Sequence, residues 1–222
     1  MINQYFSENQ SKLLRFIFER IKNERDDLPS IQELSEQLEM SVPTLREQLE
    51  VLKMLGLMDA RPRHGMRIRS IDCAASLRQT ALIATSIDMK YFYQFSDLRD
   101  KIEQAWFIPA ARKLEEKDIQ QLQECVDLAK EKLNGNPIQI PYQEHKELHL
   151  SIYKKLDNVF VSGILNTYWT LYEAVGMNLY TDLAYQQKVW NYHGEIVDAI
   201  RSRDLEKGLH LLEDHMKLIY MR

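Results

Sequence analysis

Residues 28–68 read LPSIQELSEQLEMSVPTLREQLEVLKMLGLMDARPRHGMRI, and this stretch decides the fold of the N-terminal third. Ser30 and Glu33 have the spacing of a capping box, in which two side chains satisfy free backbone N–H groups at the start of a helix. Leu34 and Leu38 follow at helical spacing. The stretch therefore predicts a short helix that packs through its leucines.

A further helix is predicted after Ser41, which is a favourable N-terminal cap. Pro43 falls in its first turn, where backbone N–H groups have no helical partner and a proline removes no hydrogen bond. The helix stops at Gly56, because glycine often follows a helix end. Two short helices joined by a tight turn predict a helix-turn-helix. The predicted buried positions of the second helix are Leu45, Leu49 and Leu52.

The neighbouring segments predict a winged helix. Residues 11–23 place apolar side chains on one face of a preceding helix, and the Asp-Asp-Leu-Pro run after them predicts a break. Residues 57–70 predict two short strands joined by a turn at Arg63-His64-Gly65. A locally basic hairpin of this kind suits the phosphates of DNA. It carries four arginines against one acidic residue: Arg61, Arg63, Arg67 and Arg69 against Asp59.

The whole chain has 222 residues, of which 45% are hydrophobic and 28% charged, and it contains only 7 glycines and 6 prolines. This composition indicates a mostly helical protein with two domains. We predict a mainly α fold, with a winged helix-turn-helix over 1–72, a linker over 73–90 and an all-helical bundle of about six helices over 91–222. In the bundle's first helix, the packed face is predicted at Leu98, Ile102, Trp106 and Ile108.

The lack of a targeting signal and the spacing of the two cysteines predict a cytoplasmic protein. The N-terminus lacks the basic start and apolar run of a signal peptide, and no stretch approaches 18 consecutive apolar residues. Cys73 and Cys125 have neither metal-ligand nor redox spacing. The formal charge of −4 does not by itself favour nucleic-acid binding, but residues 1–70 are neutral and residues 71–222 account for all of it.

Residues 28–68 resemble the winged-helix domain of GntR-type transcription regulators, from LPS through the Thr-x-Arg pair of the third helix to the wing. The resemblance implies that the third helix enters the major groove of DNA and that the wing reaches the minor groove. An arginine in the major groove can bond guanine twice and contribute about 1–3 kcal/mol of discrimination. The residues assigned to DNA in this way are Thr44, Arg46, Arg61, Arg63, His64 and Gly65.

The resemblance has two departures. Gln32 and Val42 stand where the family often has arginines, so the usual operator sequence of the family is not expected here. The alternative interpretation is a winged helix that binds another protein and carries its arginines as ordinary solvated charges.

Residues 91–219 resemble the ligand-binding FCD domain of the FadR subfamily of GntR regulators. The matching segments are DLRDKIE, an H-x-x-x-H motif, LDN, YHGEIVDAI and EDHM. The resemblance implies a divalent metal inside the bundle and a small organic acid whose carboxylate completes the coordination. Arg99 would then face this carboxylate, because a guanidinium fork suits two oxygens. The alternative for Arg99 is an ion pair with Glu103, four residues later.

Four of the six histidines are candidate metal ligands. His145 and His149 are four residues apart, so they share one helix face. His193 and His215 occupy the positions of the family's last two ligands, and His145 stands where the family usually has aspartate. Four neutral nitrogens suit Zn²⁺ or Ni²⁺, and each ligand's second ring nitrogen then needs a partner. The alternative is that they are ordinary core or surface histidines.

Together these patterns predict a homodimeric transcription regulator, not an enzyme, that binds a palindromic DNA operator and responds to a small organic acid. Lys146 stands where a metalloprotease H-E-x-x-H motif has its glutamate. Two alternatives stay open: a metal-dependent enzyme built on the bundle, and a regulator for which the metal itself is the signal.

Overall fold

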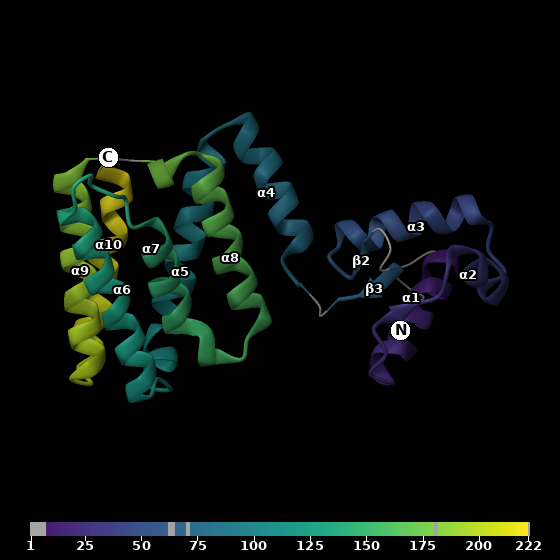
Figure 1. The fold of residues 1–222 in the computed structure, drawn as a ribbon, viewed down its shortest axis with the longest axis horizontal. Coiled ribbons are helices and arrows are strands. Elements are labelled where there is room, and N and C mark those ends of the chain that lie inside the picture. Colours follow the sequence, from purple (N-terminus) through teal and green to yellow (C-terminus); the bar gives the residue numbers. More distant parts are fainter. Residues whose placement is uncertain (1–7, 62–64, 70–71, 180–181, 222) are drawn as a thin grey trace. The chain divides into compact units, whose positions relative to one another are not determined.

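The computed structural model describes residues 8–61, 65–69, 72–179 and 182–221. Contacts divide the chain into two compact units, Met1–Ser76 and Leu77–Arg222, and each has its own hydrophobic core. Figure 1 labels the helices of both units and the strands β2 and β3. Within the described ranges, every helix is too short or too polar to span a membrane.

The first unit is a winged helix, as the sequence predicts. Its strands form an antiparallel sheet in the order β1-β3-β2. The two-residue strand β1 is missing from the sequence prediction, because its sheet signal is the pairing with β3 rather than any local pattern. The elements are α1 (Glu8–Lys22), β1 (Asp27–Leu28), α2 (Ile31–Leu38), α3 (Val42–Met54), β2 (Met58–Arg61) and β3 (Gly65–Ile68).

The predicted caps set the helix boundaries. The Glu33 backbone N–H donates to the Ser30 hydroxyl over 3.3 Å, and the Ser30 backbone N–H donates to the Glu33 carboxylate over 2.8 Å, so the capping box is present. Ser41 caps α3 through a backbone N–H of its first turn. Gly56 has a φ of +72°, and a Cβ there would lie 2.6 Å from the Cβ of Ala75. This turn therefore requires glycine.

The core of the first unit is built from all three helices and the sheet. The three leucines predicted to face inward from α3 are buried, whereas Arg46 on the same helix is exposed. The buried apolar residues include Leu13, Ile17, Leu34, Leu45, Leu49, Leu52, Met58 and Ile68.

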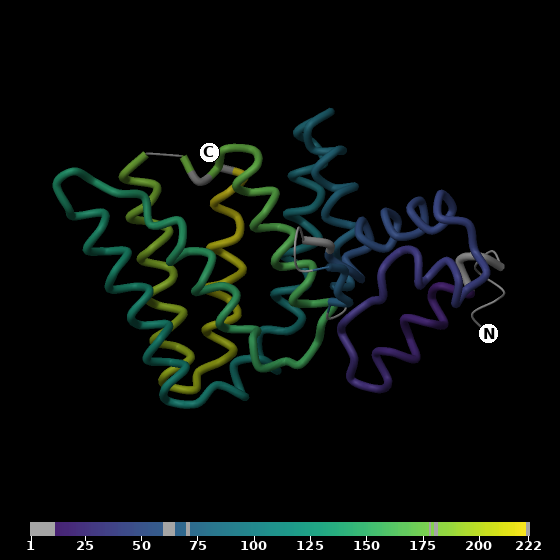
Figure 2. The backbone as a smooth tube through the Cα atoms, turned by 45° about the vertical axis from the view of Figure 1, so that its right-hand side comes forward, coloured from purple at the N-terminus to yellow at the C-terminus, as the bar shows by residue number. Residues whose placement is uncertain are grey.

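The second unit is a helical bundle. Helix α9 packs against α6 and α10, and α5 contacts α7, α8 and α10, so the long helices run side by side (Figure 2). Helix α4 occupies the segment in which the sequence places the linker. The helices are α4 (Ala75–Ile87), α5 (Lys90–Ala111), α6 (Glu116–Asn134), α7 (Tyr142–Tyr153), α8 (Val159–Ala174), α9 (Leu183–Arg201) and α10 (Leu205–Lys217), with 3-10 turns at Lys154–Leu156, Met177–Leu179 and Leu218–Met221.

The packing of α5 corrects one sequence prediction. Leu98 and Trp106, which are predicted to pack, are 44% and 38% exposed, whereas Ile102 and Ile108 are partly buried. The helical period is correct but the buried face is rotated. Charged side chains that satisfy one another can lie inside a core, and a hydrophobic pattern does not detect them. The buried face includes Phe92, Arg99, Asp100, Glu103 and Phe107.

Candidate metal centre and its buried charges

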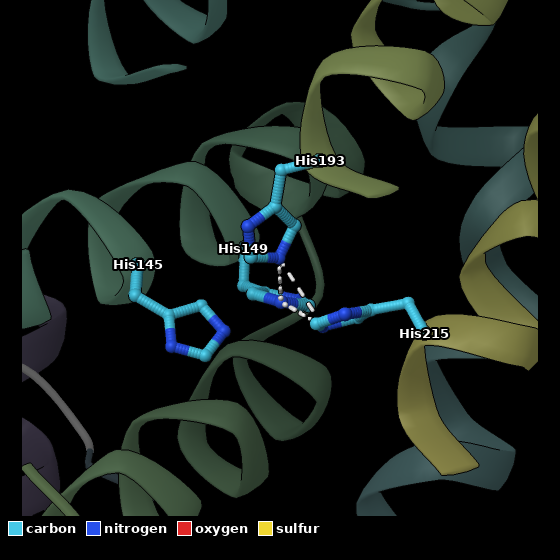
Figure 3. Close-up of side chains that lie close together, drawn as sticks. All are labelled: His145, His149, His193 and His215. Carbon is cyan, nitrogen blue, oxygen red and sulfur yellow. Dashed lines mark hydrogen bonds between the residues drawn. The ribbon is translucent and has the colours of Figure 1, made fainter. Parts of the chain in front are cut away.

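The four predicted histidines come together inside the bundle. His145 and His149 lie on α7, His193 on α9 and His215 on α10. One nitrogen from each lies within 4.8 Å of the others, a group that could hold a metal ion (Figure 3). Helix spacing brings the first pair together, and the packing of α7, α9 and α10 adds the other two.

Three of the histidines form a nearly equilateral triangle. The Nε2 atoms of His149 and His215 are 3.3 Å apart, and the Nε2 atom of His193 lies 3.2 Å from each of them. Nitrogens bound to a tetrahedral zinc at about 2.0–2.1 Å lie about 3.3–3.4 Å from one another. The spacing therefore fits three ligands of one ion.

His145 stands beside this triangle rather than in it (Figure 3). Its ring centroid is 4.8 Å from that of His193, 5.2 Å from that of His149 and 5.9 Å from that of His215, so the ring remains close to all three. The His145 ring is half-buried and also faces the indole of Trp169, with centroids 4.8 Å apart. The structure thus separates three converging nitrogens from a fourth histidine that lies within reach of them.

The converging histidines are in the form that binds metals. Burial, followed by the positive charge of Arg99, holds the pKa of His149 well below its ordinary value. Burial is also the largest cause of the lowered pKa values of His193 and His215, and neighbouring histidines add to it. These imidazoles are therefore neutral at pH 7, and a neutral imidazole offers a lone pair to an ion without first losing a proton.

A buried carboxylate supports one ligand. The Glu103 side chain, which is 0% exposed, places Oε2 2.8 Å from Nδ1 of His149. Its other oxygen, Oε1, accepts a 2.6 Å hydrogen bond from Nε of Arg99. The sequence pairs Glu103 with Arg99 only as an alternative and does not reveal its contact with His149. The available signal was the Arg-x-x-x-Glu spacing on α5, but no local pattern relates it to α7.

Arg99 is enclosed by partners. Besides Glu103, it donates from Nη1 to Asp100 over 3.2 Å, and its Nη2 lies 2.9 Å from Nδ1 of His149. Its guanidinium carbon lies 4.5 Å from the ring centroid of Tyr168. The residue predicted to face an effector is thus part of a buried network that includes the ion pair with Glu103.

Burial affects both carboxylates of this network. It raises the pKa of Asp100 to about 6, with Arg99 opposing the change. It also raises the pKa of Glu103, and contact with the Arg99 guanidinium again opposes the change. The 2.6 Å bond between Arg99 and Glu103 has the length of a charge-assisted hydrogen bond, which indicates that the pair is ionised.

The second ring nitrogens of the other two converging ligands differ from that of His149 in their hydrogen bonding. Nδ1 of His193 and Nδ1 of His215 are buried and have no hydrogen-bond partner among the residues that the structure describes. Glu103 therefore gives one of the three ligands the partner that the second ring nitrogen of a metal-bound histidine needs.

The residues predicted to contact DNA lie partly within the described ranges. Arg46 is exposed on α3, whereas the Thr44 hydroxyl is half-buried and lies 2.8 Å from the Ser41 hydroxyl at the helix cap. Gly65 is exposed and begins β3, where it pairs with Arg61 at the end of β2. The Arg61 side chain, together with Arg63 and His64, lies outside the described part of the chain.

A comparison with known proteins identifies the second unit. The FCD domain family matches residues 94–218, which is more than half of the chain. The HTH-type transcriptional regulator YcbG of Bacillus subtilis (strain 168) is 26% identical over 197 residues, which cover 87% of this chain and 79% of that protein.

Solved structures show the same fold over nearly the whole length. Streptococcus agalactiae GntR matches with a TM-score of 0.68 and 20% identity, covering 99% of this chain and 98% of the other. E. coli McbR/YncC matches with a TM-score of 0.53 and 15% identity, covering 97% of each chain. The chain therefore belongs to the GntR family of transcription regulators, and residues 94–218 form its FCD domain.

Proposed function

We propose that this regulator binds a palindromic operator as a homodimer and responds to a small organic acid held near a divalent metal, Zn²⁺ or Ni²⁺, in its FCD domain. One observation carries the sensory half of the proposal: three buried, neutral histidines place their Nε2 atoms 3.2–3.3 Å apart. We propose a binding role rather than a catalytic one for this site.

The DNA-binding half rests on residues 1–72. Arg46 is exposed near the start of α3, on the same helix as the buried leucines, and this exposure leaves its side chain open to a partner such as DNA. We propose that Thr44 and Arg46 act in the major groove, with the wing beside them. GntR regulators act as dimers, and two winged helices would read two half-sites at a spacing set by the dimer. The proposed wing contacts are Arg61, Arg63, His64 and Gly65.

The sensory half places metal and acid in one site. His149, His193 and His215 would hold the ion, and His145 would complete the set of nitrogen ligands or yield its position to the acid. An ion bound only by neutral nitrogens keeps its two positive charges, which attract a carboxylate. Arg99 lies beside this site, with its Nη2 2.9 Å from Nδ1 of His149, and its charge is compensated by Glu103 and Asp100. Acid binding alters DNA affinity only if the acid prefers one of two conformations.

DNA binding is tested by fluorescence anisotropy with a fragment of the protein's own promoter region. We expect affinity to fall steeply as salt rises, because phosphate contacts release counterions. Arg46→Ala should weaken binding by about 5- to 100-fold, which corresponds to the loss of one arginine–base contact. Arg112→Ala, an exposed arginine in the second unit, is the matched control. Equal binding by the wild type and the Arg46 variant would remove Arg46 from the interface.

Metal binding is tested by elemental analysis and by thermal unfolding with and without Zn²⁺ or Ni²⁺. A ligand that binds the folded state raises the unfolding temperature. We expect His193→Ala to lose this increase and His210→Ala to keep it, since the His210 side chain is 77% exposed. Wild-type protein with neither bound metal nor a metal-dependent shift would refute the metal site.

A further inference from the structure

Glu103 contacts Nδ1 of His149, the ring nitrogen that does not belong to the triangle. We propose that Glu103 is a positioning residue, which holds His149 with its proton on Nδ1 and its Nε2 lone pair directed at His193 and His215. This inference rests on the proposed metal site and adds a residue outside the four histidines.

The chemistry of the 2.8 Å contact fixes the direction of the hydrogen bond. An ionised carboxylate only accepts, so Nδ1 of His149 must donate to Oε2 of Glu103. A neutral imidazole carries one proton, and Nε2 is then left with its lone pair. That lone pair lies on the atom that joins the triangle with His193 and His215.

The neighbouring guanidinium offers the competing arrangement. Nη2 of Arg99 lies 2.9 Å from the same Nδ1 atom, and an arginine only donates. If Arg99 donated to Nδ1, the His149 proton would sit on Nε2, and Nδ1 would face the Glu103 oxygen with two lone pairs opposed. The two arrangements exclude each other. The first one gives the carboxylate a donor and leaves the lone pair on the metal-binding nitrogen; Nη2 of Arg99 then makes no hydrogen bond to Nδ1, and Arg99 keeps its bonds to Glu103 and Asp100.

Glu103 is held firmly enough to orient a ring. Its Oε1 atom is bonded to Nε of Arg99 at 2.6 Å, and the Tyr153 hydroxyl donates to its backbone carbonyl at 3.0 Å. The same hydroxyl lies 3.4 Å from Oε2. Because Glu103 and His149 are both 0% exposed, water does not compete for these bonds.

The contact also supplies negative charge close to a site whose ligands are all neutral. Glu103 and Asp100 carry two negative charges when ionised, and Arg99 carries one positive charge, so their sum is −1. Low polarity around buried groups strengthens the interaction of this charge with a cation. A carboxylate behind a ligating imidazole also raises the basicity of that imidazole.

The test compares full-length wild type with Glu103→Gln, which keeps the shape of the side chain and removes its charge. Zn²⁺ affinity is measured by competition with a chromophoric chelator. We expect a 10- to 100-fold loss, the usual effect of removing such a partner. Glu195→Gln, an exposed carboxylate on the ligand helix α9, should stay within about twofold of the wild type.

The outcomes separate two failures. Wild-type protein that does not bind Zn²⁺ refutes the proposed metal site itself. Wild-type protein that binds Zn²⁺ together with Glu103→Gln protein of equal affinity refutes only the role of Glu103. Circular dichroism shows whether the variant is folded.

A measurement on unaltered, metal-free protein keeps the inference testable if Glu103→Gln does not fold. In ¹⁵N-histidine NMR spectra, the signal of His149 is assigned by its loss in His149→Gln. We expect the proton on Nδ1 before any metal is added, because Glu103 accepts a hydrogen bond from that nitrogen. A carboxylate that did not accept this bond would not select the tautomer. A proton on Nε2 in the metal-free state would overturn the inference.

Discussion

Helices α3 and α5 use the same residue types in opposite ways. Helix α3 buries leucines and exposes Arg46, whereas α5 buries Arg99 and Glu103 and exposes Leu98. An exposed arginine is screened by salt and is available to a partner in solution. A buried arginine is committed to its neighbours, and its removal leaves their charges without compensation. The same charge is thus open to a partner in solution on α3 and committed to internal organisation on α5.

The largest expected effect comes from breaking the buried side of this comparison. Arg99→Met leaves the carboxylates of Glu103 and Asp100 without their cation, and we expect the second unit to lose about 3–5 kcal/mol of unfolding free energy. Urea unfolding followed by tryptophan fluorescence measures this, because the three tryptophans of the chain all lie in that unit, at positions 106, 169 and 190.

The control for this variant is Arg201→Met. Arg201 forms an exposed ion pair with Asp198, with an Arg201 side chain 40% exposed, and such pairs contribute less than about 1 kcal/mol. If Arg99→Met is no more damaging than Arg201→Met, the buried network does not organise the bundle.

The next effect concerns the apolar face of α3. Leu45 is 0% exposed, so Leu45→Ala should cost the first unit about 2–5 kcal/mol through lost burial and a cavity. Calorimetry should show an earlier transition, while the tryptophan transition of the second unit stays in place. Val51→Ala, at a residue 44% exposed on the same helix, should change stability by about 0.5 kcal/mol or less. A shifted tryptophan transition would mean that the two units do not unfold independently.

The smallest expected effect is on the pH dependence of the unfolding free energy, which reports on the buried side chains. In metal-free protein, folded His149, His193 and His215 have lowered pKa values, so the unfolded state takes up more protons as pH falls below about 6.5. Unfolding free energy should therefore decrease on acidification, by up to about 1.4 kcal/mol per pH unit for each histidine. Asp100 acts in the opposite direction below its pKa of about 6, because its folded form takes up a proton first.

His193→Gln should reduce this pH dependence by up to about 1.4 kcal/mol per unit between pH 6.5 and 5.5. His210→Gln is the matched control, since its side chain is exposed. Urea unfolding in the presence of a chelator measures both slopes. An unchanged slope in His193→Gln would contradict the lowered pKa of that residue.

The sequence predicted those features whose signals are local. The capping box of Ser30 and Glu33, the cap at Ser41 and the glycine turn at Gly56 each depend on residues close in the chain, and all three are present. Strand β1 has only two residues and depends on its pairing with β3, so no periodic pattern could reveal it.

The candidate site was predictable in its ligands but not in its geometry. The four-residue spacing of His145 and His149 fixes a shared helix face, and it does not fix which ring reaches the His193 and His215 nitrogens. The sequence does not reveal Glu103 as a partner of His149, because a run of charged residues on a helix normally indicates a solvent face. Only the tertiary packing of α5 shows that these residues are buried. Family resemblance supplied the ligands, and only the fold shows that His145 stands back.

The three converging histidines come from α7, α9 and α10, and two of them have no exposed surface. An ion bound between them would exchange only when these helices separate, so its release would be as slow as local opening of the bundle. The occupancy of the site would then not follow rapid changes in free metal concentration. A bound ion would stay in place while an acid binds and dissociates many times.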